Sequence, residues 1–277
     1  MTAPLAPPRF RLDLWWLPRA LIFGMLAFFI FGPLANLLLW TVAEKWYVPH
    51  VLPLQYGVSF WQKVFSPRGN AMESLSNSIL VAVLTVIVSL ALAIPAGYAL
   101  ARLKLPWRGV ILLAFLIPQA FPNLTVYVNI ARLFYQFNLN GTIAGVVIVH
   151  ATHGLVYAVW IATAAFSAIE LELEQAARSV GASALRAFWD VTLPLAMPGL
   201  MASAIFVFLE SLDEFTGSYF VGAPDVNMLP LLLYTASSGG NYQIASITAL
   251  LLLIPSIAFM FLVERFLKAD VLSKVGH

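Results

Sequence analysis

The chain has 277 residues, of which 61% are hydrophobic and only 10% are charged. A soluble domain carries roughly 25% charged residues, so this composition indicates a protein embedded in a membrane. The formal net charge of +2 is too small to suggest a nucleic-acid partner, and the absence of cysteine excludes disulfides, thiolate metal sites and cysteine nucleophiles.

Long apolar runs recur along the chain. A membrane-spanning helix needs about 20 apolar residues, so the sequence predicts an all-α membrane protein with six transmembrane helices. The first run follows a group of arginines but is too long for a signal peptide and lacks a cleavage site, so we expect it to be retained. The third contains Pro118 and Pro122 and is expected to be kinked or broken. The predicted spans are 20–42, 75–101, 108–134, 141–167, 195–215 and 242–267.

Basic residues are distributed unevenly over the predicted connections. With six spans, one side of the membrane holds both termini, the connection 102–107 and the connection 168–194, and most lysines and arginines lie there. The positive-inside rule makes that side cytoplasmic. The sequence thus predicts a multi-pass membrane protein with both termini in the cytoplasm and a single domain over 1–277. The few basic residues on the other side are Lys45, Lys63, Arg68 and Arg132.

The connection 168–194 changes from solidly apolar to amphipathic. Glu174 lies near the start of a predicted helix, where a carboxylate complements the helix dipole. Gly181 is expected to end that helix in the left-handed conformation. Ser183 is expected to cap a second short helix, over about 184–189.

The second short helix predicts a contact surface. Leu185, Phe188 and Trp189 would be its apolar contacts, with Arg186 on its polar rim, and Pro194 suits the first turn of the next span. Periodicity alone is equally consistent with a helix that lies on the lipid surface and with a docking helix for a cytoplasmic partner.

The spacing of particular residues resembles the cytoplasmic signature of permease subunits of binding-protein-dependent ABC importers. That signature reads Glu-Ala-Ala, three residues, Gly, nine residues, then Ile-x-Leu-Pro. Both spacings are kept, with Gln in place of Glu and Val in place of Ile. The missing charge leaves the contact with the ATPase to be supplied by another group, for which the adjacent Glu174 is a candidate. The matching residues are Gln175, Ala176, Ala177 and Gly181, then Val191, Thr192, Leu193 and Pro194.

The resemblance extends over about 75–267 and implies a type I ABC importer permease fold. It also implies the partners, namely a second permease subunit, two ATPase subunits and an extracytoplasmic substrate-binding protein. The chain has no Gly-x-x-x-x-Gly-Lys-Ser/Thr pattern, so we expect no cofactor in this chain, with ATP and Mg bound by the partner ATPase. Beyond the cytoplasmic signature, the segments that carry the resemblance to the permease family are 77–78, 95–102, 118–122 and 137–142.

Acidic residues at the end of the fifth predicted span form a second candidate site. Glu210, Asp213 and Glu214 stand at i, i+3 and i+4, so a helix would place them on one face. Acids at membrane depth are costly and mark functional candidates. They are expected to line a substrate pathway for a cation, or else to form an ordinary polar helix end at the outer boundary.

The pattern around these acids, Ser211 to Phe215, together with 220–224, resembles the permeases of spermidine/putrescine importers. It therefore implies a polyamine or another small cationic solute as the substrate. The same branch is similar to permeases for aminophosphonates, thiamine and ferric iron, which remain alternatives. Polyamine-type systems imply that the second permease is a different chain.

Other polar residues fall within the predicted spans. Tyr127, Asn129 and Asn123 in the third span, and Tyr157 in the fourth, are candidates for lining the pathway or for hydrogen bonds between helices. His150 and His153 stand one turn apart, but two ligands make a poor metal site, so hydrogen bonding between helices is the favoured reading. The sequence offers neither a nucleophile nor a complete set of metal ligands, which argues against a membrane enzyme. A secondary carrier, the other alternative, would normally show internal repeats.

Overall fold

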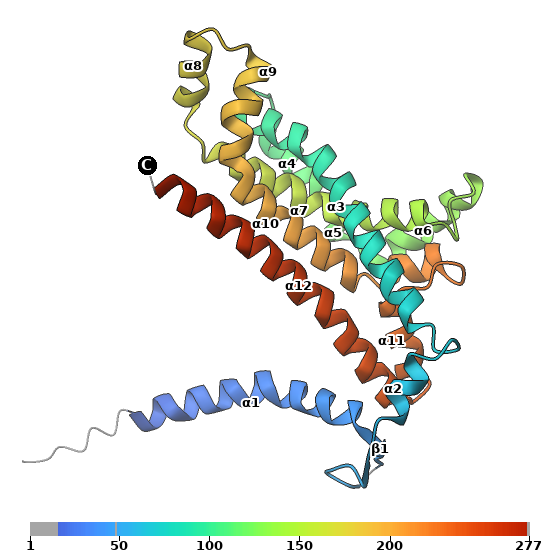
Figure 1. Ribbon diagram of the computed structural model, residues 1–277. Helices are drawn as coiled ribbons and strands as arrows, with labels where there is room; N and C mark the ends of the chain where they lie inside the picture. The colour runs from blue at the N-terminus through green and yellow to red at the C-terminus, as the bar shows by residue number, and fades with distance from the viewer. Residues whose placement is uncertain (1–15, 48, 276–277) are drawn as a thin grey trace, which may run out of the picture. The chain divides into compact units, whose positions relative to one another are not determined.

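A computed structural model describes residues 16–47 and 49–275, with side chains described as far as Arg265 (Figure 1). The packing of the backbone divides the chain into two compact units, with the division between Val58 and Ser59. The all-helical architecture expected from the sequence is confirmed. The single domain predicted for 1–277 stays a prediction.

The first unit contains one long helix and a small hairpin. Helix α1 (Trp16–Thr41) is followed by β1 (Ala43–Lys45) and β2 (Gln55–Tyr56), which pair antiparallel. The large apolar side chains of α1 are exposed, with Phe28 at 71%. Such a surface is unfavourable in water and suits a helix surrounded by lipid.

Three long helices form the centre of the second unit. They are α3 (Ala71–Arg102), α7 (Ile143–Ser167) and α10 (Leu193–Asp213), which pack against one another. Helix α3 lies so close to α7 that a Cβ placed on Gly97 would be 2.8 Å from the Cβ of Ala162. Small residues permit this close approach where the hydrophobic effect does not drive helices together.

Three further helices of this unit pack against that centre and against one another. Helix α12 (Tyr242–Val275) packs against α10 and α11 (Leu229–Ser238), and α2 (Ser59–Val64) packs against α12. Figure 1 places α2 and α11 together near the start of α12. Apolar residues of α2, α11 and α12 pack into one cluster, which lies at the end of the unit farthest from α8 and α9.

The third predicted span is broken, as its prolines indicated. It consists of α4 (Arg108–Phe115), α5 (Ile117–Ala120) and α6 (Asn123–Gln136). Pro118 lies in the first turn of α5 and Pro122 immediately precedes α6. Proline lacks the N–H that a helix interior uses, so it is favoured at a helix start, where that N–H has no helical partner.

Within the residues that the structure describes, five helices are long and apolar enough to cross a membrane. They correspond to the first, second, fourth, fifth and sixth predicted spans. The boundaries agree within a few residues except at the start of the fifth, where the continuous helix begins at Ala184 and not at 195. The sixth crossing would have to be made by the interrupted segment α4–α6. Interrupted helices are tolerated at membrane depth where protein or a cavity surrounds them.

Candidate functional site

The predicted cytoplasmic segment begins with α8 (Leu171–Ser179), which lies with α9 at one end of the second unit (Figure 1). Gly181 has a φ of +96°, so the left-handed conformation expected there is confirmed. A Cβ at this glycine would meet no heavy atom within 4 Å, so the backbone conformation alone requires glycine. Ser183 caps α9 (Ala184–Ala187) by accepting a hydrogen bond of 3.2 Å from the amide of Arg186.

The helix that begins at Ala184 continues into the fifth predicted span. It passes through a π-helical turn, η1 (Phe188–Thr192), and then directly into α10. The prediction of a separate short helix before a new start at Pro194 is therefore wrong. Pro194 has no N–H to donate, and the amide of Leu193 bonds to the carbonyl of Phe188 in the widened turn, which keeps the helix continuous.

The three apolar residues predicted to contact a partner do not share one environment. Leu185 is 69% exposed and Trp189 is 58% exposed. Phe188 instead packs against the rings of Tyr98 and Phe166, with centroids 5.0 and 6.1 Å away. The outward surface therefore retains Leu185 and Trp189, whereas Phe188 anchors the segment to its own chain.

Glu174 also faces its own chain. Its carboxylate accepts hydrogen bonds from Arg102 Nε at 2.8 Å and from the hydroxyl of Tyr98 at 3.1 Å, and it is buried. Gln175, the residue that replaces the glutamate of the signature, is exposed. The expectation that Glu174 replaces the missing surface charge is not supported, because its carboxylate is engaged inside the chain.

The other predicted coupling residues lie around the same surface. Arg186 forms an exposed ion pair with Asp190 at 3.1 Å, which contributes little to stability. Ala176 and Pro194 are exposed, and Ala177 and Leu193 are half-buried. A cavity of about 510 Å³ between α7, α8 and α10 adjoins them, lined by Ala165, Ala168, Ile169, Glu170, Leu173, Leu195, Ala196 and Gly199.

The three predicted pathway acids divide into two environments. Helix α10 ends at Asp213, so Glu214 leaves the helical register with extended backbone angles. Its carboxylate is buried and accepts hydrogen bonds from the hydroxyl of Tyr127 at 2.9 Å and the amide of Gly217 at 2.8 Å. Glu210 and Asp213 have no hydrogen-bond or ion-pair partner within the described part of the chain. The three acids still line one hollow, as the spacing predicted, but only the carboxylate of Glu214 is held by donors of its own chain.

Buried polar groups brace Glu214 from neighbouring helices. His153 Nδ1 lies 2.7 Å from the hydroxyl of Tyr127, and His153 Nε2 lies 3.2 Å from Oδ1 of Asn123. His150 is hydrogen-bonded through both ring nitrogens, to Ser211 at 2.8 Å and Ser218 at 2.9 Å. These bonds join separate segments, so the predicted hydrogen-bonding role of both histidines is confirmed.

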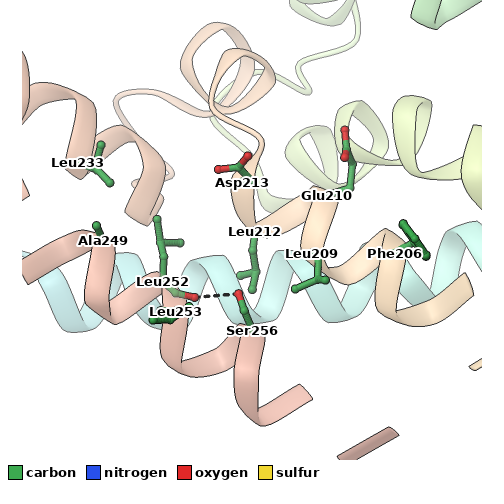
Figure 2. A pocket seen from close by; sticks show the side chains of 10 residues that line it. All are labelled: Phe206, Leu209, Glu210, Leu212, Asp213, Leu233, Ala249, Leu252, Leu253 and Ser256. Atoms are coloured by element: carbon green, nitrogen blue, oxygen red, sulfur yellow. Dashed lines mark hydrogen bonds between the residues drawn. The ribbon is translucent and has the colours of Figure 1, made fainter. Parts of the chain in front are cut away.

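Glu210 and Asp213 border two hollows. The smaller, which we call the acidic cleft, has a volume of about 180 Å³. The larger, about 560 Å³, lies between α10, α11 and α12. Figure 2 shows the carboxylates of Glu210 and Asp213 on the side of α10 opposite to Leu209 and Leu212. The acidic cleft is lined by Asn123, Glu210, Asp213, Glu214, Phe215 and Thr216.

The remaining predicted pathway residues lie elsewhere. Tyr127 is fully buried and acts as a brace for Glu214. Asn129 donates to the carbonyl of Thr125 within its own helix, and Tyr157 stacks on Phe206 with centroids 6.4 Å apart. The acidic cleft does contain Asn123, one of the candidate lining residues, and it also contains Thr216, which the site prediction did not include. The break before α6 and the turn after α10 bring these two residues to Glu210.

A family model described as "Binding-protein-dependent transport system inner membrane component" matches residues 93–271. A putative ABC transporter permease protein of Streptomyces antibioticus is 30% identical over 200 residues, covering 71% of this chain and 87% of the relative. The trehalose transport system permease protein SugB of Mycobacterium tuberculosis is 29% identical over 212 residues, covering 74% and 77% of the two chains.

The fold is similar to that of a solved bacterial ABC transporter involved in the import of the acidic polysaccharide alginate. The TM-score is 0.66, and the alignment covers 95% of this chain and 99% of the other at 18% identity. At that identity the likeness shows the fold, which is the type I importer permease fold.

Proposed function

This chain belongs to the family of inner-membrane components of binding-protein-dependent transport systems, and we propose that it forms half of an ATP-driven import pathway. It is a multi-pass inner-membrane transporter subunit and not an enzyme. In the proposal, a second permease subunit completes the pathway and two ATPase subunits bind on the cytoplasmic side. An extracytoplasmic binding protein delivers the substrate.

The observation that carries the proposal is the surface presented by α8, Gly181 and α9. Val180 is 87% exposed, Leu185 69% and Trp189 58%, and the helices α8 and α9 lie together at one end of the unit. A cluster of exposed apolar side chains next to polar residues is typical of a surface that binds another protein. The segment also continues directly into α10, so a displacement of the ATPase would act on the helix that carries Glu210 and Asp213.

The orientation follows from the same proposal. The ATPase is cytoplasmic, so α8 and α9 lie on the cytoplasmic side, as do both termini when the interrupted segment crosses the membrane. Alkaline phosphatase and green fluorescent protein fused after the last residue test this directly. We expect fluorescence without phosphatase activity, and the reverse result would overturn the orientation.

Purification of a tagged chain from its own cells in mild detergent tests the assembly. We expect a second membrane subunit and an ATPase to copurify, and the complex in nanodiscs to hydrolyse ATP in a vanadate-sensitive manner. The Trp189→Ala variant should lose most of the ATPase, whereas Tyr135→Phe, exposed on α6, should retain it. Transport by the purified chain alone in liposomes would instead indicate a secondary carrier.

For the substrate, we propose a small organic cation such as a polyamine. Glu210 and Asp213 support this, because their carboxylates have no partner within the described part of the chain and the lining of the acidic cleft includes no lysine or arginine. An ammonium group is the simplest complement to two unpaired carboxylates.

A hydroxyl-rich solute is the second candidate, favoured by the relatives named for trehalose and alginate. Carboxylates can accept hydrogen bonds from hydroxyl groups, and the side-chain amide of Asn123 can both accept and donate them. Uptake of labelled spermidine, putrescine and trehalose by cells with and without the gene separates the two. Loss of polyamine uptake alone supports the cation, and loss of trehalose uptake alone supports the hydroxyl-rich solute.

A further inference from the structure

Arg102, the last residue of α3, makes a buried connection to α8. Its Nε donates to Glu174 Oε1 at 2.8 Å, and its Nη1 donates to the carbonyl of Ile169 at 2.9 Å. Both side chains of the ion pair are about nine-tenths buried, at 9% and 10% exposure. A charge pair removed from water acts more strongly than a surface pair and requires defined geometry.

Glu174 is the anchor of its helix. Among the residues of α8, all of which the structure describes, it is the only buried one. The rest of this helix therefore contributes little packing that would hold it to the unit. The position of α8 relative to α3 depends chiefly on the bonds made by this carboxylate.

Tyr98 extends the connection to the other side of the segment. One helical turn before Arg102, its hydroxyl donates to Glu174 Oε2 at 3.1 Å, while its ring contacts Phe188 and Phe166. The end of α3 thereby touches α8 through a carboxylate and η1 through an aromatic ring. Both halves of the cytoplasmic segment meet the same turn of α3.

The same turn of α3 is packed against α7 without free space. A Cβ at Gly97 would lie 2.9 Å from the amide nitrogen of Thr163 and 2.8 Å from Ala162 Cβ. Close-packed helices move together and do not deform gradually. A displacement imposed on Glu174 is therefore passed to the α3–α7 pair as a whole.

We propose that Arg102, Glu174 and Tyr98 form a strap that makes α8 and the cytoplasmic end of α3 move as one body when the ATPase acts. The three are positioning residues: they do not contact ATP or substrate. This inference rests on the proposed function for its driving force, but the strap itself concerns two segments of this chain. It gives the ATPase a route to α3 and α7 that is separate from the continuous helix into α10.

Spin labels on opposite sides of the strap test it. The chain has no cysteine, so cysteines introduced at Lys104 and Ser179, both exposed, are its only labelling sites. Distances between the labels are measured by pulsed electron paramagnetic resonance on the assembled complex in nanodiscs, without nucleotide and after trapping with ATP and vanadate. The variants are Glu174→Gln and Arg102→Lys, with Glu172→Gln as the matched control on the exposed side of α8.

We expect one narrow distance in the unmodified strap that is unchanged by trapping, and the same in Glu172→Gln. In Glu174→Gln and Arg102→Lys the distribution should broaden and shift on trapping, while ATP hydrolysis persists. Lysine keeps the charge but cannot make both bonds of Arg102, so it tests the strap even where Glu174→Gln does not fold.

Unchanged narrow distances in both strap variants would overturn the proposal, and so would a distance that shifts on trapping while the strap is intact. A complex in which the unmodified chain recruits no ATPase would refute the proposed function instead. The nucleotide-free distributions would then still decide whether the strap holds α8 to α3.

Discussion

The hydroxyl of Tyr127 donates a hydrogen bond of 2.9 Å to the carboxylate of Glu214, although the two residues are 87 positions apart in the chain. This bond joins α6, which follows the break in the third segment, to the turn that ends α10. It fixes one wall of the acidic cleft, because Glu214 also lines that cleft.

Replacing Tyr127 with phenylalanine should loosen this wall. The change removes the hydroxyl and leaves a buried carboxylate oxygen without its donor, which costs about 1–3 kcal/mol. We expect a lower unfolding temperature of the purified protein and reduced uptake. The matched control is Tyr135→Phe, because Tyr135 lies on the same helix and is 71% exposed. Equal stability of the two variants would contradict the bracing role of Tyr127.

Neutralising Asp213 should weaken the uptake of a cationic substrate. In Asp213→Asn the shape of the side chain is kept while one of the two unpaired charges of the cleft is lost. We expect KM for the labelled polyamine to rise about tenfold, which corresponds to roughly 1.4 kcal/mol, with normal assembly on size-exclusion chromatography. Glu73→Gln, exposed in the first turn of α3, is the control. Unchanged uptake kinetics would remove Asp213 from the pathway.

Gly181→Val should separate ATP hydrolysis from uptake. The left-handed backbone at φ +96° costs a β-branched residue about 1–2 kcal/mol or more, and the segment is expected to relax by moving α8 relative to α9. Gly181→Asn should be tolerated better, since asparagine visits this conformation more readily.

Gly240 provides the control for backbone strain. It has a φ of +73° and, like Gly181, no heavy atom within 4 Å of a built Cβ. Gly240→Val therefore introduces the same kind of strain in the connection between α11 and α12, away from the cytoplasmic segment. If it lowers the ratio of uptake to ATP hydrolysed as much as Gly181→Val does, the position of Gly181 has no special role in coupling.

Truncating Trp189 and Phe188 should have opposite consequences. Trp189→Ala removes an exposed anchor and should weaken ATPase binding by about 2 kcal/mol, as for a central interface residue, without lowering the unfolding temperature. Phe188→Ala removes a ring packed on Tyr98 and Phe166 and should destabilise the chain by about 3 kcal/mol. Thermal unfolding and ATPase copurification are measured on both. Destabilisation by Trp189→Ala would contradict the surface assignment.

Restoring the glutamate of the family signature at position 175 should strengthen ATPase binding slightly. Gln175 is exposed, so Gln175→Glu places a charge at the surface without a burial cost. An exposed ion pair is worth at most about 1 kcal/mol and is weakened by salt. We expect ATPase retention to increase at low ionic strength and to be unchanged at high ionic strength. Reduced retention at low salt would indicate a negative partner surface opposite Gln175.

Much of the architecture could be read from local features of the sequence. Long apolar runs predicted where helices lie, because the cost of exposing backbone in lipid leaves little alternative to a helix. Pro118 and Pro122 predicted the break, and Gly181 and Ser183 predicted a helix end and a cap, because each effect acts within one or two turns. The spacing from Gln175 to Pro194 indicated the family.

The direction of individual side chains could not be predicted in this way. Periodicity groups residues on a helix face, but it does not say which neighbour that face meets. Phe188 turns inward because Tyr98 and Phe166, from two other helices, surround its ring. The carboxylate of Glu214 has a different environment from that of Glu210 because α10 ends at Asp213, one residue before Glu214. The regular i, i+4 spacing in the sequence does not reveal this helix end.

Local sequence patterns are sufficient to place the protein in a membrane, to locate its helices and to identify the segment that resembles the docking element of a permease. Only the folded structure shows which acids remain unpaired in the cleft and which are held by donors. It also shows that Glu174 is tied to Arg102, 72 positions away, and does not face a partner. The physical reason is range: helix formation and capping are local, whereas burial, ion pairing and cleft formation depend on segments that only folding brings together.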